Sequence, residues 1–539
     1  MFTKKRIVAL VLATVMSMSM VLTSCTTVAS KYPGTPEAGS VTVDIQQEPP
    51  KLNSILTSDV VSMNVLRHTV EGLTTLDKED KPIPGIAKGW KISDDGLTYT
   101  FNLNDSYKWS NGDTVTAKDF EFAFESLIDP KFAATYASLG FIFKNAKNFY
   151  DGKASIDEVG IKAVDDSTLE LTLENPIAYM LDLMAFVVFL PVNQKAYDAQ
   201  GDKYATDFDK MLYNGPYTMT KWVHEDQIVL TKNPNYPHAK DIKIDTIVMK
   251  MMSDSNTRMN SFKAGEIDMI ELLGDQAIAL NAEKQPVITY DDGSNWYVQY
   301  NLKSKTLSNQ KLRQALTYSI DSEAYVRDIV KNTSKKAEQM TPLTINGNKK
   351  KFAEEIGTQF KSHDIEKAKQ LLEEAKKELG VDTFKFKLLG GSTDFAKASL
   401  AYFQEMWKKE LGIEIEVVAQ PFKSRLKIME DNDFDMVMAG WSPDYNDPLT
   451  FLDMFESFNP NNYGKYNSPA YDKLIADSRV ETDRDKRFAL LMDAEKLLLS
   501  DMAVGPYYFK AKDYTVSGKL TGSVRTAFQD MNLRWAEVK

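Results

Sequence analysis

Hydrophobic and polar residues alternate in some segments of this chain and recur at helical spacing in others. Alternation over residues 97–103 and 168–173, which are rich in β-branched and aromatic residues, predicts two half-buried strands. Over residues 365–379 the apolar positions fall on one face of a helix. Ser362 or Asp364 can cap the start of this helix, and Gly380 can end it.

A strand–helix–strand unit is predicted between residues 384 and 418. Apolar residues alternate at its start, a helix over 396–411 ends before Gly412, and alternation returns over 413–418. A helical crossover of this kind joins parallel neighbours in a sheet, so the pattern indicates the α/β class. No Pro- or Gly-rich linker interrupts the chain after residue 40, which favours lobes around a cleft over separate domains.

The first 40 residues have a different character. The basic residues 4–6 precede an uncharged apolar run of 16 residues over 7–22. As a helix this run would span about 24 Å, less than the ~30 Å hydrocarbon core of a membrane. We therefore predict a signal peptide over 1–24.

The tetrapeptide Leu22-Thr23-Ser24-Cys25 resembles the lipobox of bacterial lipoproteins, which implies that a lipid is attached to Cys25. The segment 25–40 is rich in Thr, Ser, Gly and Pro and is expected to be a lipidated cysteine followed by a flexible tether. These features predict a lipid-anchored lipoprotein on the outer face of the cytoplasmic membrane, on its extracellular or periplasmic side. They favour a Gram-positive source.

The composition argues against several functions. With 65 basic and 76 acidic residues the net charge is −11, which disfavours nucleic acid as a partner. Cys25 is the sole cysteine, so an intrachain disulfide, a thiolate nucleophile and a cysteine-ligated zinc site are excluded from the rest of the chain. The four histidines are scattered, and the common nucleotide, phosphate, serine-hydrolase and zinc-protease motifs are absent. We therefore expect no enzyme activity, no catalytic residues, no metal site and no cofactor.

One long stretch carries more specific information, over residues 87–101 and 108–120. It contains a hairpin-type turn at 94–96, a possible helix cap at Thr116, and two tryptophans, Trp90 and Trp109, which we expect in a hydrophobic core. Together with other segments, this stretch resembles the bacterial extracellular solute-binding proteins (family 5) of oligopeptide and dipeptide ABC transporters. The other matching segments are 214–217, 233–236, 262–268, 312–316 and 440–448.

The resemblance implies an α/β fold with two lobes of the periplasmic-binding-protein type II-like kind, an additional inserted domain, and a hinge between the lobes. A ligand that touches both lobes would close the cleft by shifting the population of conformations. The implied partners are peptides, and the two membrane permease subunits and the ATPase subunits of an ABC importer; we expect a monomer. The implied ranges are 41–65, 195–296 and 510–539 for lobe one (domain I), 66–194 for the inserted domain II, and 297–509 for lobe two (domain III).

The resemblance also implies how a peptide binds. Asp444 matches the acidic residue that pairs with the peptide α-ammonium, although its spacing alone fits a turn cap equally well. A protein that binds peptides irrespective of their side chains is expected to hold the two peptide ends with fixed groups and the peptide links with strand-like hydrogen bonds. For the residues other than Asp444, hinge or core packing is the alternative. The implied peptide-binding residues are Asp444, Trp441, Ser442, Gly440, Tyr445, Glu48, Trp296, Tyr297 and Asn301.

Two departures from the family pattern bear on specificity. Met429 and Met438 align with basic residues that meet the peptide α-carboxylate in some members, so this group would be less tightly specified or bound by Arg425 or Lys427. Ser294 and Ser442 stand where some members have a disulfide. The preferred peptide length therefore stays open.

Other functions remain compatible with the sequence. The same fold can bind a dipeptide, a peptide pheromone, a nickel chelate, haem or a sugar; the few histidines argue weakly against metal, and Asp444 argues for a free amino terminus. A secreted peptidase is disfavoured by the missing motifs. An adhesin or a signalling receptor without a transport partner stays open.

Overall fold

The computed structural model of the chain describes residues 30–32, 34–177 and 179–539. The predicted signal peptide, Cys25 and the tether up to residue 29 lie outside the described residues. Within the described ranges, no helix has both the length and the apolar character needed to cross a membrane.

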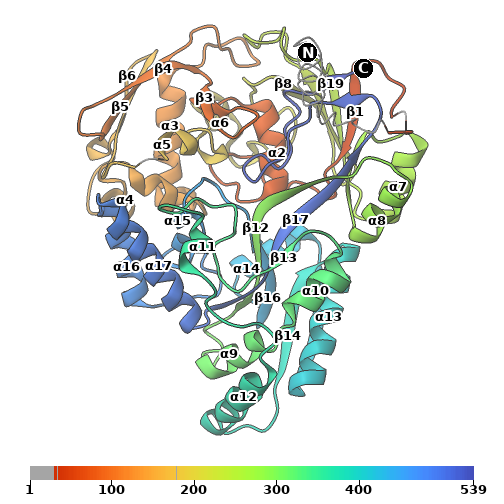
Figure 1. Ribbon diagram of the computed structural model, residues 1–539. Helices are drawn as coiled ribbons and strands as arrows, with labels where there is room; N and C mark the ends of the chain where they lie inside the picture. Colours follow the sequence, from red (N-terminus) through yellow and green to blue (C-terminus); the bar gives the residue numbers. More distant parts are fainter. Residues whose placement is uncertain (1–29, 33, 178) are drawn as a thin grey trace, which may run out of the picture.

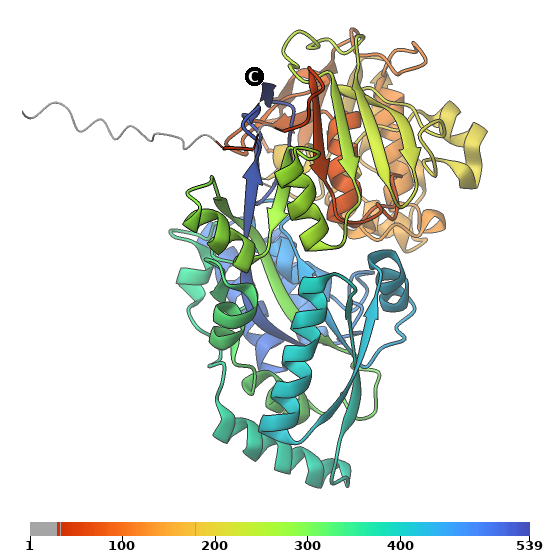
Figure 2. The same ribbon diagram turned by 90° about the vertical axis from the view of Figure 1, so that its right-hand side faces the viewer.

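A large mixed sheet of 11 strands passes through both lobes. Its central strands, β12 (Ile288–Tyr300) and β17 (Val504–Val516), are antiparallel, and each is 13 residues long. They run from the upper part of the molecule into the lower lobe (Figures 1 and 2). The strand order is β15-β14-β16-β12-β17-β11-β1-β10-β9-β8, with β13 also paired to β17. The remaining strands of this sheet are β1 (Ser40–Asp44), β8 (Tyr217–Val223), β9 (Gln227–Lys232), β10 (Thr246–Lys250), β11 (Met269–Leu272), β13 (Lys335–Lys336), β14 (Lys385–Gly391), β15 (Glu414–Gln420) and β16 (Met436–Trp441).

Lobe two contains the predicted strand–helix–strand unit. β14 and β15 are parallel, with Leu388 opposite Val417, and α13 (Asp394–Leu411) connects them. The helix predicted over 365–379 is also confirmed as α12 (Ile365–Leu379). The carboxylate of Asp364 accepts a hydrogen bond from the backbone of Lys367, and Gly380 ends the helix at φ +69°. The hydrophobic periodicity therefore predicted these elements of the lobe correctly.

The inserted domain II is a four-stranded antiparallel sheet, in the order β4-β5-β7-β6. Its strands are β4 (Ala87–Ile92), β5 (Thr98–Leu103), β6 (Ile161–Asp165) and β7 (Thr168–Thr172), and α3 (Ala117–Ile128) packs on it. Thr116 and Asp119 form a capping box at the start of α3. Trp109 is buried as expected, and its Nε1 donates to Asp119 at 3.2 Å. Trp90, on the edge strand β4, is half-buried and also packs against the hydrophobic core, although less deeply than Trp109.

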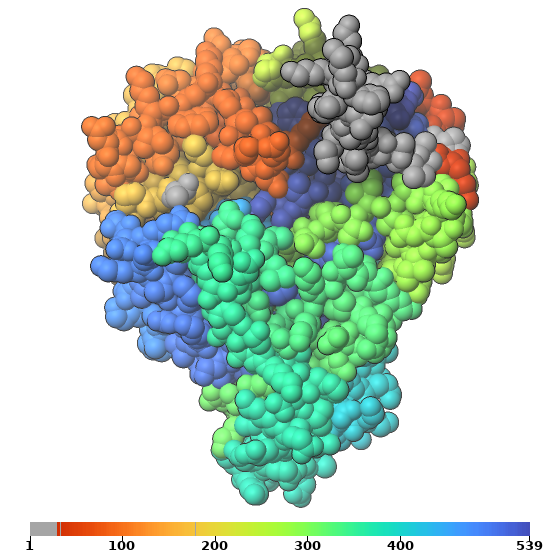
Figure 3. Space-filling model, in the orientation of Figure 1, coloured from red at the N-terminus to blue at the C-terminus, as the bar shows by residue number. Residues whose placement is uncertain are grey.

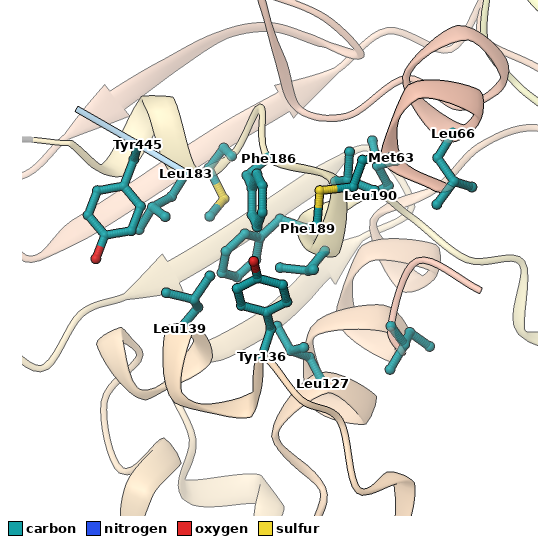
Figure 4. Close-up of a cluster of buried hydrophobic side chains, with 14 of the residues drawn as sticks. Met63, Leu66, Leu127, Tyr136, Leu139, Leu183, Phe186, Phe189, Leu190 and Tyr445 are labelled. Carbon is teal, nitrogen blue, oxygen red and sulfur yellow. The ribbon is translucent and has the colours of Figure 1, made fainter. Parts of the chain in front are cut away.

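Domain II lies against the helices α16 and α17 of lobe two, as Figure 1 shows, and the two surfaces meet without a gap in the space-filling view (Figure 3). Apolar side chains of both contribute to one large hydrophobic cluster. Figure 4 shows Tyr445 of lobe two beside Leu183 of domain II. The further elements are α2 (Val60–Thr69), α4 (Ala146–Tyr150), α5 (Met180–Leu183), α6 (Gln194–Gln200), α7 (Ser255–Ala264), α8 (Gly274–Ala282), α9 (Gln310–Tyr318), α10 (Ser322–Tyr325), α11 (Phe352–Ile356), α14 (Phe422–Glu430), α15 (Leu449–Leu452), α16 (Pro469–Val480), α17 (Arg484–Ser500), β2 (Thr74–Leu76), β3 (Pro82–Pro84), β18 (Leu520–Thr521) and β19 (Glu537–Val538).

The passage between the lobes is made by β12 and β17, and the implied lobe limits 296/297 and 509/510 fall inside these two strands. Their register shifts between Asp291 and Asn295, which is a bulge. Gly293 lies in this bulge at φ +72°, and a Cβ there would come within 2.8 Å of the Ala527 side chain. The bulge therefore requires glycine. Its neighbours Asp292 and Ser294 line the interlobe cavity described next.

Candidate functional site: a cleft between the lobes

Two adjoining cavities of about 320 and 150 Å³ lie between the lobes, and we call them the large and the small chamber. Seven residues line both chambers, so the two cavities adjoin and share a wall. These shared residues are Val60, Asp292, Phe422, Arg425, Gly440, Ser442 and Asp530. A cleft of this size, with apolar walls and a few polar groups, is typical of a small-ligand site.

Asp444 lines the small chamber, in the loop that follows β16. Its Oδ1 accepts a hydrogen bond of 3.0 Å from the Tyr136 hydroxyl of domain II. The Thr450 hydroxyl lies 3.4 Å from its Oδ2. Burial raises the pKa of Asp444 well above its usual range, and the nearby Asp453 adds to this, while the hydrogen bonds from Tyr136 and Thr450 oppose it. Among the described residues, no cationic side chain lowers this pKa or pairs with the carboxylate. The site can therefore accept a cation from a ligand.

The loop carrying Asp444 is held by ion pairs behind it. Arg487 of α17 donates to both carboxylate oxygens of Asp447, at 2.8 and 2.9 Å. Arg479 of α16 pairs in the same bidentate way with Glu456, at 2.6 and 2.7 Å. Such two-point contacts fix orientation as well as distance, so the Asp444 backbone has a defined position before ligand arrives.

Five of the residues that the sequence analysis proposed, besides Asp444, lie at the cleft. Gly440 and Ser442 line both chambers, Trp296 the large one, and Tyr297 and Trp441 the small one. The ring of Trp296 covers Gly440 so closely that a Cβ there would lie 2.7 Å from it. Ser294 and Ser442, the pair at which the sequence analysis expected a departure from the family pattern, are in contact, with Oγ atoms 3.1 Å apart.

The structure does not bring Glu48, Tyr445 and Asn301 to either chamber. Glu48 accepts hydrogen bonds from the His224 ring and the Glu225 backbone, at 2.7 and 2.8 Å. Tyr445 stacks on Tyr179 of domain II, with ring centroids 4.6 Å apart. The Asn301 amide donates to the backbone oxygen of Phe434 at 2.8 Å and so has a structural contact in lobe two.

Tyr136 and a group of charged residues at the cleft were not predicted. Most of the charged groups form pairs: Lys510 with Glu271 at 3.4 Å, and Lys512 with Asp530 and, at 3.6 Å, with Asp292. They lie on β11, β12 and β17 and on the C-terminal segment after β17, where no local sequence pattern marks them. Arg425 of α14 differs, because no described carboxylate pairs with it.

Several contacts join the two sides of the cleft. Asp394 at the start of α13 accepts hydrogen bonds from the backbone and hydroxyl of Ser255, at 3.3 and 3.1 Å. Lys331 pairs with Asp275 at 2.7 Å on another side. With the Tyr136–Asp444 bond, these contacts describe a closed arrangement of the lobes.

Solved structures of related proteins support the fold over nearly the whole chain. The chain aligns with Listeria monocytogenes OppA bound to peptide at a TM-score of 0.89 and 32% identity, covering 93% of this chain and 99% of that one. The murein tripeptide-binding protein MppA of Escherichia coli matches at a TM-score of 0.86 and 25% identity, covering 95% of this chain and 99% of that one. The unliganded open form of MppA, also at 25% identity, matches at a TM-score of only 0.62, covering 94% of this chain and 99% of that one. The difference between these two scores agrees with a closed arrangement.

Sequence comparison gives the same result. The chain is 35% identical over 514 residues to the oligopeptide-binding protein OppA of Bacillus subtilis (strain 168), covering 93% of each protein. Residues 81–463 match the sequence profile described as bacterial extracellular solute-binding proteins, family 5, middle region. With its two lobes, inserted domain and central cleft, the chain belongs to the bacterial extracellular solute-binding proteins of family 5.

Proposed function

We propose that this protein binds oligopeptides in the interlobe cleft and is the substrate-binding component of an ABC importer. The names of its relatives support this ligand class: the Bacillus subtilis protein is called oligopeptide-binding, and the Listeria protein was solved with peptide bound. The observation on which the proposal rests is the state of Asp444. A buried carboxylate without a cation is unfavourable, and a peptide α-ammonium would remove this penalty.

The backbone beside Asp444 suits a peptide chain. β14 pairs with β16 only at Met436 and Val437, whereas β12 pairs with β16 as far as Trp441. One edge of β16 is therefore unpaired by β14 from Met438 onward, and Gly440 is exposed to the cleft there. An extended peptide can add to such an edge by main-chain hydrogen bonds, which do not depend on side-chain identity.

The test compares Asp444→Asn with the native protein by calorimetry, using a tripeptide with a free or an acetylated amino terminus. Loss of one partner of a buried charge pair costs about 2–5 kcal/mol, so we expect the variant to bind the free peptide roughly 30-fold or more weakly. Acetylation should weaken native binding to a similar extent and have little further effect on the variant, since both changes remove one interaction.

Glu48→Gln provides the matched control, because it also removes a carboxylate but lies outside both chambers. We expect it to bind like the native protein. If all three proteins bound the free and the acetylated peptide equally, the ammonium site at Asp444 would be refuted.

We also propose that a lipid on Cys25 holds the protein at the outer face of the cytoplasmic membrane, where it passes peptides to two permease subunits and their ATPase subunits. The lipobox-like sequence at 22–25 supports this arrangement. Uptake of a labelled peptide by cells that carry or lack this chain would test the transport role.

A further inference from the structure

Arg425 occupies the junction of the two chambers, since it lines both. Its Nη1 donates to the backbone oxygen of Met438 at 3.1 Å, and its guanidinium lies over the Phe422 ring, 5.3 Å from the ring centre. These two contacts hold the cation in place without neutralising it. A guanidinium fixed in this way is prepared for a planar, two-oxygen partner.

No described carboxylate lies within 4.0 Å of Arg425, and its Nε is buried without a hydrogen-bond partner in the described chain. Burial lowers the pKa of Arg425 to about 10, so the group stays charged at neutral pH. Among the other cations of the large chamber, Lys510, Lys512 and Arg258 have carboxylate partners. Arg525 has no ion pair within 4.0 Å among the described residues, but the nearby carboxylates of Asp530 and Glu271 raise its pKa, whereas no described carboxylate acts on Arg425 in this way. The unpaired cation at the junction is thus the counterpart of the unpaired carboxylate of Asp444.

Lys427, two residues along the same helix, provides a contrast. Its ammonium is exposed, pairs with Asp431, and does not line either chamber. Arg425, in contrast, is bonded to the backbone of Met438, one of the two positions where some relatives carry a basic side chain. The structure therefore separates the two cations that the sequence left as alternatives.

We propose that Arg425 binds the α-carboxylate of the ligand, and that this protein prefers short peptides with both ends free. The inference rests on the proposed function, because it takes Asp444 as the ammonium site. Asp444 lines only the small chamber, whereas Arg425 lines both chambers. A peptide that spans the small chamber places one end on each charge, whereas a longer peptide continues past Arg425 into the large chamber.

The test uses di-, tri- and penta-alanine, each as the free acid and as the carboxamide, with native protein, Arg425→Met and Lys427→Met. For the length that reaches Arg425, two or three residues, we expect the native protein to bind the acid at least about 30-fold more tightly than the amide. For penta-alanine the native protein should bind the acid and the amide with nearly equal affinity. Arg425→Met should abolish the preference for the acid, and Lys427→Met should retain it.

Melting of the ligand-free variants separates binding from folding. Arg425→Met should melt at or above the native temperature, because it removes a buried charge that has no partner. Arg425→Lys should retain part of the acid preference, since it keeps the charge but loses the two-point geometry.

Three results would overturn the inference. One is equal native affinity for acid and amide at every length, and another is an unchanged preference in Arg425→Met. The third is dependence on Arg425 only for peptides with an acidic side chain, which would assign the carboxylate to that side chain. In each case the Asp444→Asn comparison still reports on the proposed function, so the two failures are distinguishable.

Discussion

Peptide binding should release a proton from Asp444, and this release can be measured. Burial raises the pKa of this carboxyl well above its usual range in the protein without ligand. A peptide ammonium favours the ionised form, so binding lowers the same pKa. The ammonium itself, with a pKa of about 7.7–8.0, stays charged in mildly acidic solution.

The sign and the size of the effect follow from linkage. Above the raised pKa, Asp444 is already ionised and affinity does not depend on its titration. Below that pKa the protein must lose a proton to bind, so affinity falls by up to tenfold for each pH unit, or about 1.4 kcal/mol. Affinity is therefore expected to rise with pH until the carboxyl of the free protein is ionised.

The assay is calorimetry of a free tripeptide over a series of pH values from acidic to neutral, at each pH in two buffers with different ionisation enthalpies. The dependence of the heat on the buffer gives the number of protons released. Burial also raises the pKa of the neighbouring Asp453 to about 7, so this group can contribute. The useful quantity is therefore the difference between the native protein and Asp444→Asn, which we expect to approach one proton.

Equal proton release by the two proteins, with parallel pH profiles of affinity, would refute this reasoning. It would mean that Asp444 is already ionised in the free protein or does not contact the ammonium. A difference confined to affinity, without a difference in proton release, would favour the first of these explanations.

Three further predictions concern other parts of the chain. Cys25→Ala should move the protein from the membrane fraction to the medium, because stable anchoring needs the lipid; a variant that stays in the membrane fraction would contradict lipidation at this residue. Paired Ser294→Cys and Ser442→Cys substitutions in a Cys25→Ala background should form a disulfide under air, since the native hydroxyls are 3.1 Å apart. The disulfide should stabilise the fold by about 2–4 kcal/mol. Two free thiols after oxidation would show that the geometry does not permit the bond. His68 is buried, and burial is the chief cause that lowers its pKa to about 4. As the pH falls, this histidine becomes protonated in the unfolded chain before it does so in the folded protein, so the free energy of unfolding should fall by about 2 kcal/mol between pH 7.5 and 5. Urea unfolding should show a smaller fall for His68→Gln than for the native protein, and the same fall in both proteins would exclude this histidine as the cause.

The sequence predicted those parts of the fold that are local. The amphipathic helix α12 and the unit β14–α13–β15 are short-range patterns, and their burial follows the expected faces. Periodicity could not show that β12 and β17 are adjacent, since they are more than 200 residues apart in the chain.

For the site, too, the sequence predicted local features but not the contacts between distant parts of the chain. The resemblance located the loop of Asp444 and Trp441, but it did not indicate which loop side chains face the cleft. Tyr445 turns away to stack on domain II. Tyr136, which bonds Asp444 from 308 residues away, has no signal near it in the sequence. Arg425 could be named beforehand only as one of two options, because whether a cation is unpaired depends on the packed structure.

The place of β17 in the sheet has a consequence for the order of folding. This strand lies between β12 and β11 and joins the two halves of the large sheet, yet it comprises residues 504–516 of a chain of 539. Before β17 has been synthesised, its two neighbours β12 and β11 are already present, and their facing edges stay unpaired until residue 516 has been made. Contacts of such long sequence separation form late and slowly. The complete sheet, and with it the cleft, can therefore arise only after synthesis has passed β17.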